Sequence, residues 1–173
     1  MTPRVEHVQF EQMYRANRDK LYAYLLRRTR DATDAADLLA DVFVVAWRRR
    51  AVLPAPAEQR PWLFGVARKT LLAHFRRQQR DERVTAQLGD QLTRSAAYPP
   101  ESNSHRVLRA LESVSARDRE LLTLAVWDEL TCDEIAVILG LKPVAVRVAL
   151  HRARERLRNV LTDSDVRRRL TSC

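Results

Sequence analysis

Apolar residues recur every three or four positions along most of the chain, and this spacing predicts α-helices. The pattern predicts helices at residues 6–29, from about 34 to 50, 61–80, 105–113, 115–127, 132–139 and 143–163. Only three glycines interrupt it, and long stretches of Ala, Leu, Arg and Glu favour the same state. The sequence therefore predicts an all-α fold.

The apolar period is lost once, between Arg83 and His105, in the stretch RVTAQLGDQLTRSAAYPPESNSH. A segment of this length without regular structure is unusual inside one compact domain. We therefore expect two small helical domains, at residues 1–82 and 106–165, joined by a flexible linker at 83–105 and followed by a tail at 166–173.

Residues that begin or end helices separate the predicted segments. The candidate N-terminal caps are Asp31, Thr33, Asp34, Ser115 and a capping box formed by Thr131 and Glu134. Two prolines exclude regular helix from 51–59, so we expect Pro61 to be the first residue of the third helix. That helix should bury Trp62 and Val66. Gly140 should end the helix that begins after Thr131.

The stretch LGLKPVAVRVALHRARERLR carries two stripes on its predicted last helix. The apolar stripe is Val146, Leu150, Ala153 and Leu157, and the polar stripe is Arg147, His151, Arg154 and Arg158. They lie about 100° apart around the axis, so one can pack on a core while the other faces outward. A short helix, a glycine-containing turn and a longer basic helix form the pattern of a helix-turn-helix. The structural alternative is a surface helix made soluble by arginine.

Charge favours a polyanionic partner. The chain holds 31 Lys and Arg against 22 Asp and Glu, a net charge of +9. Residues 60–80 hold six of the basic residues and no acid. Such concentration on single helices is typical of nucleic-acid binding, although an arginine-rich solubilising surface would also produce it.

Three motifs resemble those of bacterial RNA polymerase sigma factors of the extracytoplasmic function (ECF) type. The stretch DATDAADLLADVFVVAWRRR is similar to the family's polymerase-binding helix, and RPWLFGVARKTLLAHFRRQQR to its promoter-melting helix. LRALESVSARDRELLTLAVWDELTCDEIAVILGLKPVAVRVALHRARERLR resembles its C-terminal promoter-binding domain. The motifs occur in the family's order and cover most of the chain.

The sequence departs from the family pattern at some positions of the C-terminal motif. Lys142, Pro143 and Val144 replace the usual small or polar residues of the turn. Val148 and Ala149 stand where many members have Ser and Arg. These differences leave the promoter sequence open.

The resemblance implies a subunit that binds core RNA polymerase, recognises two promoter elements and helps to separate the strands. Polymerase binding is expected at Asp37, Leu38, Asp41, Val42 and Arg48. Minus-ten DNA is expected to contact Arg60, Trp62, Arg68, Lys69, His74, Arg76 and Arg77. Minus-thirty-five DNA is expected to contact Lys142, Arg147, Val148, His151, Arg152 and Arg154.

Several residues of the three motifs also have a structural interpretation. Asp34 and Asp37 suit the dipole of a helix N-terminus. Trp47 and Trp62 have the spacing of core residues. Arg156 and Arg158 are expected to be solvated or to contact phosphate.

Two other classes of protein compete with this interpretation. A stand-alone helix-turn-helix regulator would explain residues 130–158 but leave the basic helix at 61–80 unexplained. An enzyme such as a helical nuclease is disfavoured, since the sequence has no HExxH motif, no Cys/His metal spacing and no glycine-rich phosphate loop. We expect no cofactor and no metal.

The expected partners are core polymerase, promoter DNA as duplex and single strand, and an anti-sigma factor. The sequence has no apolar stretch of the length that spans a bilayer and no signal-peptide pattern near its start. We therefore expect no membrane insertion and a cytoplasmic location.

Overall fold

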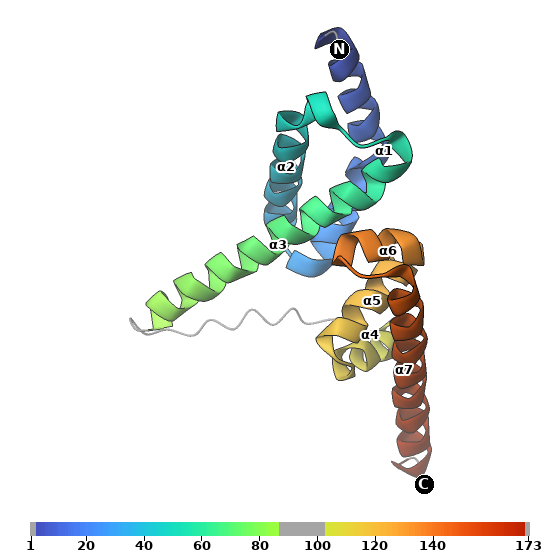
Figure 1. The fold of residues 1–173 in the computed structure, drawn as a ribbon. Coiled ribbons are helices and arrows are strands. Elements are labelled where there is room, and N and C mark those ends of the chain that lie inside the picture. The colour runs from blue at the N-terminus through green and yellow to red at the C-terminus, as the bar shows by residue number, and fades with distance from the viewer. Residues whose placement is uncertain (1–2, 87–102, 172–173) are drawn as a thin grey trace. The chain divides into compact units, whose positions relative to one another are not determined.

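A computed structural model describes residues 3–86 and 103–171, and the regular structure in these ranges is helical (Figure 1). The elements are α1 (Pro3–Thr29), α2 (Ala32–Arg48), the short 3-10 helix η1 (Arg50–Val52), α3 (Pro56–Ala86), α4 (Asn103–Ser113), α5 (Ala116–Val126), α6 (Cys132–Leu139) and α7 (Pro143–Thr171). No strand occurs among the described residues. The predicted all-α fold is confirmed.

The helices belong to two compact units. The first contains α1, α2 and α3, and the second contains α4, α5, the first part of α6, and α7. Within the first unit the three helices pack against one another in every pairing, and α3 continues well past the other two (Figure 1). In the second unit, α7 packs against both α4 and α5.

Each unit has its own apolar core. In the first, the rings of Tyr24 and Phe64 meet edge to face with their centroids 5.2 Å apart. Around them lie the buried side chains of Leu21, Leu25, Leu38, Val42, Ala46, Leu63 and Ala67. The core of the second unit contains Leu121, Leu122 and Leu124 of α5, Ile135 and Ala136 of α6, and Val146, Leu150 and Ala153 of α7.

The predicted helix signals are mostly confirmed. Asp31 caps α2, since its carboxylate accepts from the amides of Thr33 and Asp34 at 2.8 and 3.0 Å. Ser115 caps α5. The capping box that begins α6 is complete, because Glu134 accepts from the amide of Thr131 at 2.8 Å and Thr131 accepts from the amide of Glu134 at 3.2 Å. Gly140 follows α6 with φ +66°, a conformation that favours glycine.

The predicted start of the third helix is wrong. The helix α3 begins at Pro56, so Pro61 is its sixth residue rather than its first. Pro56 occupies the first helical position, where the missing amide hydrogen costs no bond. Pro61 loses only the bond to the carbonyl of Ala57, and the helix continues through it.

The expected buried face of this helix is also partly wrong. Trp62 and Val66 are only half-buried, whereas Leu63, Phe64, Ala67 and Leu71 form the buried face. The ends of the predicted linker are helical, since α3 reaches Ala86 and α4 begins at Asn103. Residues 87–102 of that linker lie outside the described residues. The helix α7 runs to Thr171 and includes most of the predicted tail.

Candidate nucleic-acid and polymerase interfaces

The helix α7 presents the basic stripe that the sequence predicted. Val146 and Ala153 are fully buried, which fixes the side of the helix that faces the core. Arg147, His151 and Arg154 lie on another side and are exposed. Lys142, just before the helix, and Arg152 are exposed as well. The cationic side chains of α7 can therefore meet a ligand without any change in packing.

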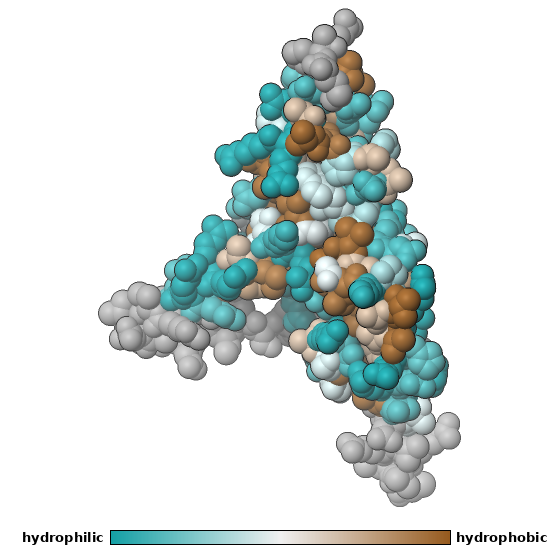
Figure 2. Space-filling view, viewed as in Figure 1, coloured by the Kyte–Doolittle hydropathy of each residue, from teal (hydrophilic) through white to brown (hydrophobic). Residues whose placement is uncertain are grey.

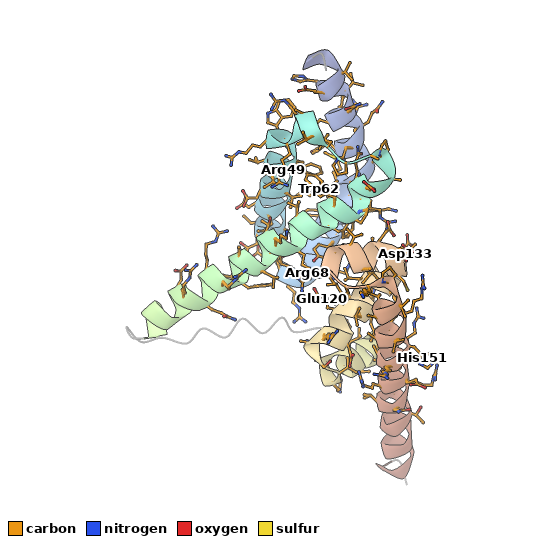
Figure 3. All side chains as sticks on the ribbon, viewed as in Figure 1. Arg49, Trp62, Arg68, Glu120, Asp133 and His151 are labelled. Atoms are coloured by element: carbon orange, nitrogen blue, oxygen red, sulfur yellow. The ribbon has the colours of Figure 1, made fainter. Side chains whose placement is uncertain are left out.

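Two of these exposed side chains have acidic neighbours on the surface. The Nη2 atom of Arg147 lies 3.3 Å from Oδ1 of Asp133 on α6, and both side chains are more than half exposed. His151 Nδ1 lies 3.6 Å from Oε2 of Glu155 one turn later. Figure 3 shows Asp133 on α6 and His151 on α7 of this unit. Exposed pairs of this kind contribute little free energy, so an external anion can replace the carboxylate.

A groove beside α7 gathers three of the predicted DNA-binding residues. It is lined by Ser115, Arg117, Asp118, Lys142, Val144, Ala145, Val148, Ala149, Arg152 and Arg156. Lys142, Val148 and Arg152 thus share one concave surface with Arg117, which the sequence interpretation did not include. Arg117 lies in the first turn of α5, two residues after the predicted Ser115 cap, and this position was the only sequence feature that could have pointed to it as a DNA-binding residue.

Arg156 pairs with an acid of its own unit, although 56% of its side chain is exposed. Its Nη1 atom donates to Oδ1 and Oδ2 of Asp118 at 2.9 and 2.7 Å. The expectation that it would be solvated or contact phosphate missed this partner, which lies 38 residues earlier in the chain.

The predicted polymerase-binding residues divide into a buried and an exposed set. Leu38 and Val42 are buried at 2% and 0% exposure, so they pack α2 and cannot touch a partner in this conformation. Asp37, Asp41 and Arg48 are exposed. Their spacing of four and seven residues places all three on one side of the helix, within about 40° around its axis.

The exposed side of α2 includes a residue that the sequence interpretation missed. Val44 lies three residues after Asp41 and four before Arg48, on the same side, and is 45% exposed. The core position expected for Trp47 is only partly confirmed. Its ring packs edge to face on Phe10 at 4.9 Å, yet 36% of the residue is exposed.

The basic residues of α3 do not form one site, because they are distributed around the helix. Trp62, Lys69 and Arg76 follow at intervals of seven residues and share one side. Lys69, Arg76 and Arg77 are exposed, whereas Arg60, Trp62, Arg68 and His74 are half-buried. Figure 3 shows Trp62 and Arg68 on α3 and Arg49 at the end of α2.

His74 and Arg77 lie beside the acidic helix instead. His74 Nε2 is 3.4 Å from Oδ2 of Asp34, an ion-pair distance without hydrogen-bond geometry. A shallow groove there is lined by Asp34, Asp37, Leu38, Ala40, Asp41, His74 and Arg77. Two residues predicted for DNA thus adjoin the surface predicted for polymerase, a proximity that the sequence did not indicate.

The described residues show little that suggests another kind of site. On the face in Figure 2 hydrophilic residues cover most of the surface, and hydrophobic ones form small patches. No group of three or more His, Cys, Asp or Glu side chains in the described ranges is arranged to hold a metal ion. None of the described helices has the length and apolar character that a membrane span requires.

Comparison with known proteins identifies both halves of the chain. Residues 13–81 match the model of sigma-70 region 2, and residues 104–157 match that of sigma-70 region 4. The RNA polymerase sigma factor YlaC of Bacillus subtilis is 30% identical over 160 residues, which cover 89% of this chain and 92% of that protein. The ECF RNA polymerase sigma factor SigL of Mycobacterium tuberculosis is 31% identical over 86% of both chains.

Solved structures agree with these matches. The sigma factor RpoE, in complex with the anti-sigma factor NepR from Bartonella quintana, has a similar fold with a TM-score of 0.68 at 23% identity. That match covers 89% of this chain and 97% of RpoE. CnrH, in complex with the cytosolic domain of CnrY, gives a TM-score of 0.59 at 26% identity over 90% and 88% of the two chains.

The family explains both basic segments, whereas a stand-alone helix-turn-helix regulator would leave the match of residues 13–81 without a role. The chain belongs to the ECF sigma factors of the sigma-70 family, non-enzymatic proteins that bind core RNA polymerase and direct it to promoters.

Proposed function

We propose that α7 reads the duplex minus-thirty-five element, while the N-terminal unit binds core polymerase and holds the separated minus-ten strand. The observation that carries this division is the exposed basic side of α7, which lies about 100° around the helix axis from the side buried in the core of its unit. A helix so fixed can enter the major groove without unpacking, since that groove is wide enough for one α-helix.

On α7 we assign the duplex contacts to Arg147, Val148, His151, Arg152 and Arg154, with Lys142 on a phosphate. Arg147 is in the second turn of the helix, where recognition helices reach base edges. A bidentate contact between arginine and guanine contributes about 1–3 kcal/mol of discrimination. Arg117 extends the same positive surface onto α5 and suits a second phosphate contact.

On α2 we assign polymerase binding to the exposed stripe of Asp37, Asp41, Val44 and Arg48. Its acidic half suits a basic helix on the polymerase, and Val44 adds an apolar contact between charges. Leu38 and Val42 support this stripe from the core side. The burial of both side chains keeps α2 in one orientation on α1 and α3.

On α3 we assign the separated strand to the side that carries Trp62, Lys69 and Arg76. An aromatic ring offers a stacking surface for a base, and the two cations suit successive phosphates. Arg60, Arg68, His74 and Arg77, the other residues expected at this element, lie on other sides of α3, and the three arginines add to the positive field around the strand without sharing the stripe. Phosphate attraction of this kind depends strongly on salt.

We further propose that the chain acts in the cytoplasm and is controlled by an anti-sigma factor. Two of the similar solved structures are complexes, RpoE with the anti-sigma factor NepR and CnrH with the cytosolic domain of CnrY. The exposed stripes on α2 and α7 would be unavailable to polymerase and DNA if such a partner covered them.

Reconstitution tests this assignment. The full chain is mixed with core polymerase and a pool of genomic promoters, and the starts of the transcripts are sequenced. We expect specific starts above the level of core polymerase alone. The interpretation fails if the reconstituted enzyme makes no such transcripts.

Variants then test the division between the units. Arg147→Ala should keep polymerase binding and weaken promoter binding by about 5- to 150-fold, the range for one lost bidentate contact. Asp41→Lys should reduce co-purification with core polymerase at least tenfold without unfolding. Asp19→Lys on α1 makes the same charge change at an exposed position and should leave co-purification unchanged. Loss of polymerase binding in Arg147→Ala would contradict the division.

A further inference from the structure

Two exposed valines lie on the side of α7 that points away from the core. Val144 and Val148 are 65% and 46% exposed. Each stands two residues from the buried Val146, which places it about 160° from Val146 around the helix axis. This is the side where a surface helix normally carries polar residues. Packing within the unit therefore does not explain the two valines.

The surroundings of these valines are positive. Lys142 precedes them, Arg152 lies on one side and Arg147 on the other. The groove that holds both valines also holds Arg117 and one acid, Asp118, which is paired with Arg156. The nearest acid on the same side of α7 is Glu155, which comes two turns after Val148 and lies beside His151. An apolar strip inside a cationic rim suits a polyanion that also offers apolar groups.

We propose that Val144 and Val148 contact the methyl groups of thymines in the major groove, so that they set part of the base preference of this sigma factor. The inference rests on the proposed function of α7. Thymine C5-methyl is the apolar group that base edges display in that groove, and it is read by apolar side chains. Arginine cannot supply this contact, because its donors select guanine or phosphate.

The spacing of the valines limits the positions of the thymines. Four residues of helix rise about 6 Å, close to two base steps of about 3.4 Å each along a strand. The two methyl groups should therefore lie about two base pairs apart within the upstream element. The guanine expected at Arg147 should lie within the same few base pairs, since Arg147 is adjacent to Val148 in the chain.

Replacement of thymine by deoxyuridine tests the contact, since it removes the methyl group and leaves the base-pairing edge intact. Holoenzyme made from core polymerase and the full chain is bound to a promoter selected from the genomic pool. Each thymine of its upstream element is then replaced singly. We expect binding to weaken about fourfold at one or two positions, the change that corresponds to about 0.8 kcal/mol for one buried methyl-sized group.

The valine variants identify the side chains responsible. In Val148→Ala the ratio of thymine to uracil affinity should fall to near one at one position, and in Val144→Ala at the other. Val126→Ala changes an equally exposed valine on α5 and should leave both ratios unchanged. A selected upstream element with no uracil-sensitive position, or with none that responds to these variants, overturns the inference.

These outcomes separate the inference from the proposed function. If Arg147→Ala still weakens promoter binding while every uracil substitution is silent, the valines do not read thymine and the role of α7 stands. If Val144→Ala and Val148→Ala weaken the binding of an acidic peptide instead of changing the thymine-to-uracil ratio, the two valines form a protein contact, and this inference is wrong. If the holoenzyme selects no promoter at all, the proposed function itself fails.

Discussion

Arg156 on α7 donates from one nitrogen to both carboxylate oxygens of Asp118 on α5, at 2.9 and 2.7 Å. The Asp118 side chain is 7% exposed and that of Arg156 is 56% exposed. The pair therefore joins a buried acid in the first turn of α5 to an exposed residue near the middle of α7, one turn beyond Arg152. We infer that it fixes the angle at which α7 leaves the core.

Removing Arg156 should destabilise the C-terminal unit. Arg156→Ala leaves a buried carboxylate without its cation, and we expect the free energy of unfolding to fall by about 2 kcal/mol, within the range for hydrogen bonds to charged groups. Native-state hydrogen exchange of the α5 and α7 amides measures this unit by itself. Arg158→Ala, at an exposed position two residues later, should change it by less than about 0.5 kcal/mol. Equal losses in both variants would contradict the role of the pair.

The same substitution should have opposite effects at two glycines. Gly140 has φ +66°, so Gly140→Ala should destabilise the C-terminal unit by about 1–2 kcal/mol through backbone strain alone. Gly65 lies inside α3, and a methyl group there meets no atom within 4 Å. Gly65→Ala should therefore stabilise the N-terminal unit by about 0.5–1 kcal/mol. Urea unfolding of the two variants checks both signs, and a shift of the two in one direction would refute the conformational explanation.

Local signals predicted much of the fold because they act over a few residues. The caps at Asp31 and Ser115 and the stop at Gly140 all depend on side chains or backbone within one turn. The start of α3 was mispredicted for the same reason. Both Pro56 and Pro61 suit a first helical position, and only packing of the extra turn decides between them. Trp62 and Phe64 are two residues apart and therefore lie on nearly opposite sides of α3, and the burial of Phe64 depends on its contact with Tyr24, 40 residues earlier.

The candidate site was predicted as a set of residues but not as surfaces. Leu38 and Val42 were predicted to bind polymerase together with Asp37 and Asp41, because the sequence motif does not separate the buried side of α2 from the exposed one. Packing on α1 and α3 makes that separation, and it reveals Val44 between the charged positions. The pairing of His74 with Asp34 likewise depends on how α2 and α3 cross, which no local pattern records.

The side of α3 assigned to the separated strand should show itself in salt dependence. Each phosphate contact to a single strand contributes about −0.7 to the slope of log K against log salt. Lys69→Ala and Arg76→Ala should each make the slope about 0.7 less steep when holoenzyme binds a single-stranded minus-ten fragment. Arg15→Ala, an exposed arginine of α1 that pairs with Glu11, is the matched control and should leave the slope unchanged. Unaltered slopes in Lys69→Ala and Arg76→Ala would remove this side of α3 from the strand path.

Asp133 should improve the selectivity of Arg147 rather than its affinity. Its carboxylate lies 3.3 Å from the guanidinium, so it both orients Arg147 and repels phosphates that approach it at random. Asp133→Asn should tighten binding to unrelated duplex DNA and change promoter binding less. The preference for the promoter should then fall by up to about fivefold, the upper range for an exposed ion pair. Competition binding of holoenzyme to a selected promoter and a scrambled fragment measures this preference.

In an Arg147→Ala background the same substitution should leave the preference unchanged, because the group that Asp133 orients is gone. An equal effect of Asp133→Asn in both backgrounds would mean that it acts only through net charge.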